Sequence, residues 1–512
     1  MSTEAHTEPP STKAPPEIPE ELLDPDAVKV VRRLRRAGHQ AYLVGGCVRD
    51  LLLRIRPKDF DVATSAHPNQ VKETFRNSRL IGRRFRLAHV FYTGKIIEVS
   101  TFRANPLDEL QDLPDDLLIR HDNVFGNAEE DARRRDFTVN GLFYDVGEGR
   151  VIDYVGGRED LRARLVRTIG NPNVRMREDP VRILRAIRFA AKCAFDVEPT
   201  TLAAMREHVD EIPRCAPPRV LEEVLKLLRS GAARRCFELL REVRALRILL
   251  PPVAAYLEKG GQEEAERHLR ALTALDAHVR VGEIPSDAVL LATLLAPLPR
   301  VSGPPKAAQA PPEAAPSEKD DEELDRELSA LEESSEDEEE EAAAAEPAGE
   351  DPAQAPLPEG ALVEAAELHD ERLGGVSPFA ATTEAQSWSL PQDVVAPEIV
   401  LSEMVRTARL PRRISERARM ILLAQPILSG ERRRRRSSPQ AFAKQSYFPE
   451  ALAVFELSVA ATSQGHEQLA KWQQIFAGQD LSQVEDDDRH PGRGDTRKRR
   501  RRRGGRGRKR QA

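Results

Sequence analysis

The chain has 512 residues, of which 40% are apolar and 32% are charged, which is enough apolar material for roughly two to four folded domains. It contains no run of about 18 apolar residues, which excludes a membrane-spanning helix, and its first residues, MSTEAHTEPPSTKAPPEIPE, lack the apolar region of a signal peptide. The four cysteines form no C-x-x-C pair, which argues against a zinc site or a disulfide framework and favours a reducing cytoplasm.

The net charge of −6 hides two segments of opposite charge. Residues 318–341 contain fifteen acidic residues against Lys319 and Arg326, so the rest of the chain carries a net charge of +7. Residues 491–512 contain twelve Lys or Arg residues against Asp495. A basic protein with one acidic inclusion indicates a polyanionic partner, most simply a nucleic acid.

The first part of the chain predicts an α+β head domain over residues 24–160, behind a disordered Pro/Glu/Thr-rich leader at 1–23. Asp24 is suited to cap a helix that begins at Pro25 and ends near Gly38. The other expected elements are a strand at 41–44, a helix at 47–54, a strand that begins at Asp59 within 57–66, a helix at 67–77, a β-hairpin at 87–102, and strands in TVNGLFYDV and VIDYV before residue 160.

The remainder predicts an all-α protein with two low-complexity segments. Residues 161–300 have a helical pattern throughout. Residues 302–359 form an acidic insert that we expect to be a disordered, solvated linker, with binding to the basic tail as the alternative. Helical patterns return within 360–483, including 360–372, and we expect 484–512 to be an Arg-rich disordered tail.

Asp59 and Asp61 are two residues apart in an expected strand, so their carboxylates should point to the same face. Two carboxylates that close repel each other unless a cation lies between them. Mg²⁺ often binds one or two carboxylates together with substrate phosphates. Such D-x-D pairs are common on protein surfaces, however, so the pair alone is weak evidence for a metal site.

The residues upstream of this pair suggest a place for a phosphate. Gly45-Gly46 end the strand at 41–44 and begin a helix, whose first backbone N–H groups suit an anion. Arg49 lies in the first turn of that helix, within reach of a triphosphate. Glu98 is a third acid, in an apolar stretch typical of a strand, and is either a metal ligand or an outward-facing glutamate at a sheet edge.

Six motifs carry a resemblance to a known family: LVGGCVRD (43–50), PKDFDVAT (57–64), IEVSTFRA (97–104), RRRDFTVNGLFYD (133–145), DYVGGREDL (153–161) and REDPVRILRAIRFAAK (177–192). In order and spacing, the chain resembles the class II tRNA nucleotidyltransferase/poly(A) polymerase family over roughly residues 40–250. This resemblance implies a palm-like nucleotidyltransferase head followed by helical neck and body domains. It also implies a transfer reaction with two Mg²⁺ ions, of which one activates the RNA 3′-OH and the other binds the nucleotide phosphates and the leaving pyrophosphate.

The resemblance also assigns roles to single residues. Asp59 and Asp61 correspond to the metal ligands, and Glu98 corresponds to the third acidic position. Asp136 corresponds to an acid with a catalytic role in poly(A) polymerases, although a structural salt bridge to the adjacent arginines explains it equally well. Nucleotide-binding roles fall on Gly45, Gly46, Arg49, Arg135, Asp179, Arg182 and Arg185.

Glu178, Asp179 and Arg182 form an E-D-x-x-R motif that we expect on one helix, with Arg185 one turn further on. Positions i and i+3 share a helix face, so Asp179 and Arg182 can act together on the hydrogen-bonding edge of a base. The resemblance implies that this pair serves as a protein template in place of a nucleic-acid template. Without the resemblance, a salt bridge along the helix would be the default interpretation.

Three features favour poly(A) addition over CCA addition. The segments LIGRRFRLAHV (80–90) and DNVFGNAEEDARRRDFT (122–138) resemble poly(A) polymerases more than CCA-adding enzymes. The basic C-terminal region is the third feature, because it gives sequence-independent affinity for RNA phosphates. The arginines that we expect to bind RNA there are Arg432, Arg433, Arg434, Arg435, Arg436, Arg499, Arg500 and Arg501.

The sequence therefore predicts a cytoplasmic, monomeric enzyme that transfers AMP from ATP to RNA 3′ ends without a template and releases pyrophosphate. RNA 3′ ends and ATP are its expected partners, and RNA-decay or RNA-chaperone proteins are further candidates. The nearest alternative is a CCA-adding tRNA nucleotidyltransferase. A non-catalytic RNA-binding protein is the second alternative, and it is disfavoured because Asp59, Asp61 and Glu98 are all present.

Overall fold

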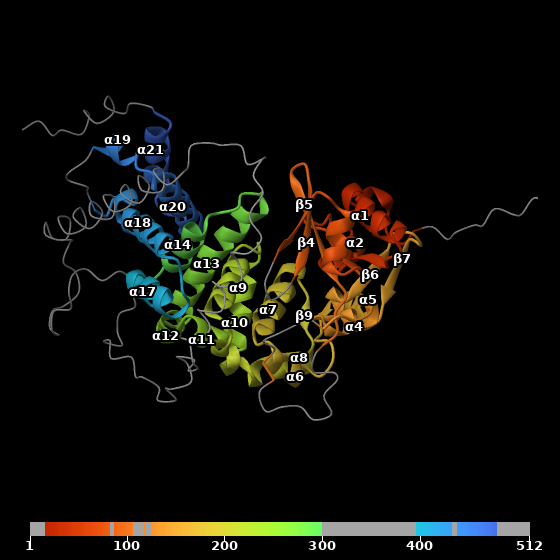
Figure 1. Ribbon diagram of the computed structural model, residues 1–512. Helices are drawn as coiled ribbons and strands as arrows, with labels where there is room; N and C mark the ends of the chain where they lie inside the picture. The colour runs from red at the N-terminus through yellow and green to blue at the C-terminus, as the bar shows by residue number, and fades with distance from the viewer. Residues whose placement is uncertain are drawn as a thin grey trace, which may run out of the picture.

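The computed structural model describes residues 16–81, 86–105, 117–118, 124–299, 396–432 and 438–478. A mixed sheet-and-helix head, coloured red to orange in Figure 1, is followed by helices coloured yellow to blue. This confirms the predicted fold class for the part of the chain that the structure describes. In that part, no helix combines the length and the apolar character needed to cross a membrane.

A seven-stranded sheet forms the centre of the head, with the strand order β3-β4-β5-β2-β1-β6-β7. Its strands are β1 (Ala41–Val44), β2 (Asp61–Thr64), β3 (Ser78–Ile81), β4 (Leu87–Tyr92), β5 (Lys95–Thr101), β6 (Leu142–Asp145) and β7 (Arg150–Asp153). β2 and β5 are parallel, and their register places Asp61 opposite Glu98. The sheet therefore brings two acids that are distant in the sequence into the same central position.

Four helices complete the head. One side of the sheet packs against α1 (Pro25–Arg36), α2 (Gly46–Leu52) and α3 (Pro68–Thr74), and a second, smaller core forms under α4 (Ala128–Arg134). The predicted start of α1 is confirmed, because the Asp24 carboxylate accepts hydrogen bonds from the backbone N–H groups of Asp26 and Ala27. The predicted hairpin is also confirmed, as β4 and β5, whereas β3 was not predicted.

The predicted leader at 1–23 is wrong for residues 16–23, which pack against the head. Ile18 is buried in the head core, and the Glu17 N–H donates to the Gly149 carbonyl over 2.9 Å. Glu17 also pairs with Arg158 at 2.7 Å, and a 3₁₀ helix, η1 (Glu20–Leu22), follows. The composition of the segment, which is rich in Pro and Glu, did not predict that Ile18 would be buried. Residues 1–15 lie outside the described residues.

The chain after the head is helical, with one small exception. One 3₁₀ helix, η2 (Thr138–Asn140), still lies inside the head. The helices that follow are α5 (Gly157–Ala163), α6 (Pro172–Glu178), α7 (Val181–Cys193), α8 (Pro199–Glu207), η3 (Val209–Arg214), α9 (Pro217–Leu228), α10 (Ala233–Glu242), α11 (Ala245–Leu249), α12 (Pro251–Lys259), α13 (Gly261–Arg280) and α14 (Asp287–Leu295). The exception is a parallel pair, β8 (Leu165–Val166) and β9 (Asp196–Val197). The purely helical prediction missed this pair because two residues are too few to give a periodic pattern.

The last helices belong to the same core as the helices before residue 300. They are α17 (Pro397–Thr407), α18 (Arg412–Leu428), α19 (Pro439–Phe442), α20 (Phe448–Thr462) and α21 (His466–Phe476). Every residue from 288 to 295 in α14 is buried, and α14 packs against both α18 and α20, which lie beside it in Figure 1. The region predicted at 360–483 is thus joined to the region at 161–300.

Three of the predicted segments cannot be compared with the structure. The acidic insert at 302–359 and the helical pattern at 360–372 lie outside the described residues, and so does the tail at 484–512.

Candidate active site

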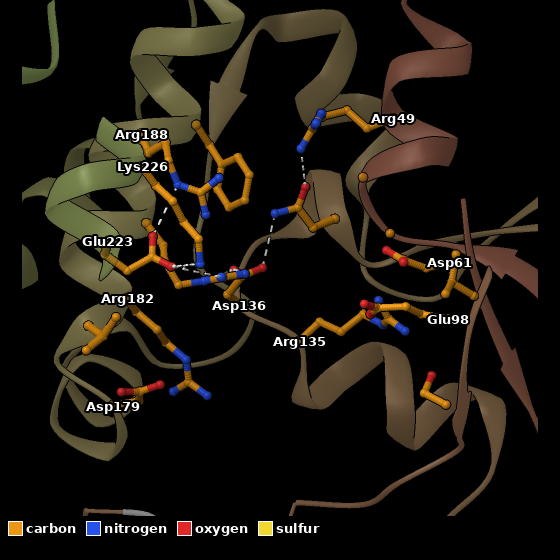
Figure 2. Close-up of a pocket in the computed structure, with 18 of the residues that line it drawn as sticks. Arg49, Asp61, Glu98, Arg135, Asp136, Asp179, Arg182, Arg188, Glu223 and Lys226 are labelled. Atoms are coloured by element: carbon orange, nitrogen blue, oxygen red, sulfur yellow. Dashed lines mark hydrogen bonds and ion pairs between the residues drawn. The ribbon is translucent and has the colours of Figure 1, made fainter. Parts of the chain in front are cut away.

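A cavity of about 670 Å³ opens between the head sheet and helices α7 and α9, and its size is typical of small-molecule sites. It is lined by every catalytic and nucleotide-binding residue predicted above except Asp59. Figure 2 shows Asp61 and Glu98 on the strand side of this cavity, with Arg182, Arg188 and Lys226 on the helical side. The fold therefore gathers the predicted residues around one space with acidic and basic walls.

Asp59 does not lie in a strand, contrary to the prediction. β2 begins at Asp61, and Asp59 is exposed just before it. The reason is the partner strand: β1 ends at Val44, opposite Asp61, because the chain turns away at Gly45. Asp59 consequently has no residue of β1 to pair with. Its charge nevertheless acts on Asp61, as the pKa of Asp61 shows.

Asp61 and Glu98 form the acidic wall of the cavity. Burial raises the pKa of Asp61 to about 6, and the negative charges of Glu98 and Asp59 add to this rise, while Arg135 opposes it. Glu98 is not at a sheet edge, because β5 lies between β4 and β2. Its side chain is 50% exposed, and its Oε1 lies 3.5 Å from Nε2 of His89. Glu98 therefore faces outward from the middle of the sheet, into the cavity.

The acidic wall fits a divalent cation that a phosphate-bearing substrate helps to bind. Within the described residues, no group of three or more His, Cys, Asp or Glu side chains is arranged as a ready-made metal site. Asp61 and Glu98 instead face each other in register, with repulsion that a cation would relieve. Mg²⁺ needs only one or two carboxylates when substrate phosphates and waters supply the other oxygens.

The turn between β1 and α2 requires glycine. Gly45 has φ +76°, a conformation that other residues rarely adopt, and a Cβ on it would lie 3.1 Å from Nη1 of Arg135. Arg49, one turn into α2, is only 3% exposed. Its Nε and Nη2 donate to Asp50 Oδ1 over 2.9 and 2.7 Å, and its Nη1 donates to Asn140 Oδ1 over 2.6 Å. The Arg49 guanidinium is thus fixed at the cavity wall.

Asp136 is paired with an arginine, although not with an adjacent one. Its Oδ2 accepts hydrogen bonds from Nε and Nη2 of Arg185, on α7, over 2.9 and 2.6 Å. Its Oδ1 accepts from the Phe137 N–H and from Asn140 Nδ2, over 2.8 and 3.1 Å. Burial alone would raise the pKa of Asp136, but the charge of Arg185 and these hydrogen bonds lower it to about 2. These contacts favour the structural interpretation of Asp136.

Arg135 borders the acidic wall from the end of α4. Its Nε and Nη2 donate to Asp131 Oδ2 over 3.2 and 2.8 Å, and its guanidinium carbon lies 5.3 Å from the ring centre of Phe143. Asp131 is fully buried, and its pKa is lowered because the charges and hydrogen bonds of Arg135 and Arg134 outweigh its burial. Arg135 is therefore fixed beside Asp61, whose negative charge it partly balances.

The E-D-x-x-R motif does not lie on one helix, and this corrects the prediction. α6 ends at Glu178, and Asp179 has an extended backbone (φ −151°, ψ 90°) before Pro180. The alternative interpretation, a salt bridge between Asp179 and Arg182, is not seen among the described residues either, because Arg182 donates to Glu178 Oε2 over 2.8 Å. Asp179 Oδ2 instead accepts from Nη2 of Arg219, on α9, over 2.9 Å. Asp179 and Arg182 still line the same cavity.

Further cavity residues were missed by the sequence analysis. On α7, Arg188, Phe189 and Lys192 continue the line of Arg182 and Arg185 at helical spacing, a signal that REDPVRILRAIRFAAK already contained. On α9, no signal marked the cavity residues, which are Arg219, Glu222, Glu223 and Lys226. Glu223 is buried between the two helices, and its Oε2 accepts from Nε of Arg188 over 3.2 Å.

The predicted RNA-binding arginines are almost all outside the described residues. Arg432 follows α18 and does not line the cavity. Arg433–Arg436 and Arg499–Arg501 have no described position, so their role stays a prediction.

Three family models match the chain in order. The Poly A polymerase head domain matches residues 41–167. The probable RNA and SrmB-binding site of polymerase A matches residues 194–257. The polymerase A arginine-rich C-terminus matches residues 391–508. The three matches together include the head, part of the helical core and the basic C-terminal region.

Individual relatives agree with these models. Poly(A) polymerase I of Salmonella typhimurium is 47% identical over 251 residues, which are 48% of this chain and 54% of the relative. Poly(A) polymerase I of Haemophilus influenzae is 45% identical over 261 residues, 50% of this chain and 58% of the relative. The CCA-adding enzyme of Lactobacillus helveticus is 36% identical over 213 residues, 42% of this chain and 52% of the relative. The chain spans about half the length of the curated relatives it matches.

A solved structure has a similar fold. The crystal structure of the Bacillus stearothermophilus CCA-adding enzyme in complex with CTP matches with a TM-score of 0.51 and 23% identity, over 89% of this chain and 83% of that one. This likeness supports the arrangement of a sheet-bearing head followed by helices.

Proposed function

Since the chain belongs to the class II tRNA nucleotidyltransferase/poly(A) polymerase family, we propose that it polyadenylates RNA: it transfers AMP from ATP to the 3′-OH without a template and releases pyrophosphate. The main reason to propose poly(A) addition rather than CCA addition is the match of residues 391–508 to the arginine-rich C-terminus of polymerase A. The higher identity to Poly(A) polymerase I than to the CCA-adding enzyme supports the same choice.

The acidic wall is the proposed site of catalysis. Bound at Asp61 and Glu98, with Asp59 as a further ligand, Mg²⁺ ions would favour ionisation of the RNA 3′-OH and neutralise the triphosphate and the leaving pyrophosphate. Arg49 presents a fixed positive charge to the triphosphate, because Asp50 and Asn140 hold its guanidinium. The protein's main contribution is to position the reactants and to supply charge within one cavity.

Asp179 and Arg182 are the proposed readers of the base. Arg182 supplies N–H donors, and Oδ1 of Asp179 is a buried acceptor with no hydrogen-bond partner among the described residues. Adenine and cytosine each present an amino donor beside a ring-nitrogen acceptor, whereas guanine and uracil present the reverse order. The pair therefore suits A and C over G and U, and further contacts must distinguish A from C.

The proposed activity can be tested with one nucleotide at a time. Purified protein with Mg²⁺ is incubated with a generic RNA or with a tRNA that lacks its CCA end, and each NTP is supplied singly and then in mixtures. We expect long A-tails on the generic RNA from ATP alone. Addition that stops after three nucleotides on tRNA, and requires CTP, would identify a CCA-adding enzyme instead. RNA binding with no incorporation would support a non-catalytic RNA-binding protein.

The basic tail is proposed to increase affinity for any RNA. Deleting residues 491–512 should weaken RNA binding and leave the transfer step intact. The slope of log K against log salt should flatten by roughly 0.7 for each tail side chain that contacts a phosphate of single-stranded RNA. The measurement is RNA affinity at several salt concentrations, with kcat at saturating RNA as the control. An unchanged salt slope would show that the tail does not contact RNA phosphates.

We also propose that the enzyme acts in the cytoplasm as a monomer. The four cysteines support a reducing compartment, because all are free thiols. RNA-decay or RNA-chaperone proteins remain candidate partners, and the match of residues 194–257 to a probable SrmB-binding site supports such a partner.

A further inference from the structure

In the part of the chain that the structure describes, one face of the β3–β4–β5 part of the sheet is not covered by a helix. Val90 and Val99 point into the head core, so the alternate side chains of the same strands point the other way. We call this second surface the open face. Its side chains include Arg79 of β3, Leu87, His89 and Phe91 of β4, and Ile96 and Glu98 of β5.

Beside its polar residues, the open face exposes apolar and aromatic side chains at one end of β4 and β5. Phe91 and Ile96 lie directly opposite each other in the antiparallel register, and they are 40% and 46% exposed. The ring of His89 lies 6.5 Å from the ring of Phe91, at a steep angle. Neighbouring exposed apolar side chains on one sheet face are typical of a surface that binds another molecule.

The open face continues without a break into the candidate active site. Leu87 and Glu98 belong to the open face and also line the cavity, together with Asp61. His89 lies opposite Glu98 in the register and contacts it at 3.5 Å. In Figure 1, β4 and β5 lie on the side of the head that faces α7 and α9. A molecule that extends from Asp61 along the sheet would therefore cover His89 and then Phe91.

The chemistry of the proposed reaction determines which molecule this is. In phosphoryl transfer, the attacking and leaving oxygens lie on opposite sides of the phosphorus atom. Asp179 and Arg182, the proposed readers of the base, lie on the helical side of the cavity in Figure 2, whereas Arg49 belongs to the head. With the base bound there, the RNA that supplies the attacking 3′-OH can reach the acidic wall along the open face, which joins the cavity at Leu87 and Glu98.

We propose that the open face binds the last unpaired nucleotides of the RNA substrate, with bases stacked on Phe91 and His89 and the backbone passing near Arg79. Stacking suits this role, because every base has a π-face and the contact does not depend on sequence. Unpaired bases have free faces, whereas bases in a duplex are already stacked on one another. The inference rests on the proposed function, because it takes an RNA 3′ end as the substrate.

The test replaces Phe91 and measures RNA and ATP separately. Phe91→Ala should weaken binding of a labelled single-stranded oligoadenylate by about tenfold and raise the KM for RNA by a similar factor. The KM for ATP should change by less than about twofold, because ATP binds elsewhere. Phe91→Trp keeps an aromatic face and should retain the wild-type affinity for oligoadenylate. Blunt duplex RNA should bind the wild type and Phe91→Ala equally.

Phe125→Ala is the matched control. Phe125 is 47% exposed and also contacts a histidine, His67, but it is not on the open face and does not line the cavity. Its replacement should leave oligoadenylate binding unchanged. Wild-type affinity in a folded Phe91→Ala would overturn the inference, and so would equal losses in Phe91→Ala and Phe91→Trp. A wild type that binds oligoadenylate but adds no nucleotide would instead contradict the proposed function.

Discussion

Asp61→Asn is expected to reduce AMP incorporation by on the order of a thousandfold or more while leaving RNA binding intact, because it removes a carboxylate that the proposed cation site needs. Asparagine has nearly the same shape as aspartate, so packing at the start of β2 should be preserved. The change also removes the repulsion between residue 61 and Glu98, which lie opposite each other. Without added metal, the variant should therefore be at least as stable as the wild type. Steady-state incorporation and thermal unfolding are the two measurements.

A second readout does not depend on activity. Mg²⁺ should raise the melting temperature of the wild type and raise that of Asp61→Asn much less, because a ligand that binds only the folded state stabilises it. Asp59→Asn should lose incorporation as well, which tests a residue that lies outside the cavity lining. Glu129→Gln is the control, because Glu129 is an exposed acid on α4, paired with Arg133. Near-normal incorporation by Asp61→Asn would show that Asp61 is not a ligand of the catalytic metal.

Asp136→Asn should lower the free energy of unfolding by about 2–3 kcal/mol at neutral pH, since it leaves Arg185 without its main partner. We expect a smaller loss of stability than for a fully buried ion pair, because the Arg185 side chain is 34% exposed and a carboxylate oxygen of Glu223 lies 3.9 Å from it. Urea unfolding measures the loss. The double variant Asp136→Asn/Arg185→Leu should recover part of the stability, because it removes the unpaired charge.

The same pair predicts a defined pH dependence. The pKa of Asp136 is about 2 in the folded protein, against an ordinary value of 3.8. A lowered carboxyl pKa contributes stability above the ordinary value, and this contribution is lost as the pH falls toward 2. The difference between the wild type and Asp136→Asn should therefore be constant from about pH 7 to pH 5 and shrink below about pH 4. If Asp136→Asn keeps the wild-type stability but loses most of the activity, Asp136 has a catalytic role rather than a structural one.

Local sequence signals correctly predicted the start of the first helix and the β-hairpin of the head. Asp24 before Pro25 identified the start of α1, and the hairpin predicted at 87–102 contains β4 and β5 with Thr93-Gly94 at its turn, because caps and turns depend on a few adjacent residues. β3 was missed because its four residues, SRLI, include two polar ones and directly follow a helix and turn.

The error over Asp179 could have been avoided. Pro180 follows directly, and a residue before proline is pushed toward an extended backbone, which is the conformation that Asp179 has. Its actual partner could not have been found in the same way. Arg219 is forty residues away on another helix, and Arg185 is forty-nine residues from Asp136. Spacing along the chain carries no information about such contacts, which arise only when helices pack.

The burial of α14 has a consequence for the order in which this protein is made. Each residue from 288 to 295 is buried, and the helices that cover α14 include α18 and α20, which follow more than a hundred residues later. A nascent chain leaves α14 without these partners until those helices leave the ribosome. Because α7 belongs to the same core, the helical side of the cavity should complete its packing only after those helices have been made. Premature termination before residue 396 should therefore give an aggregation-prone fragment.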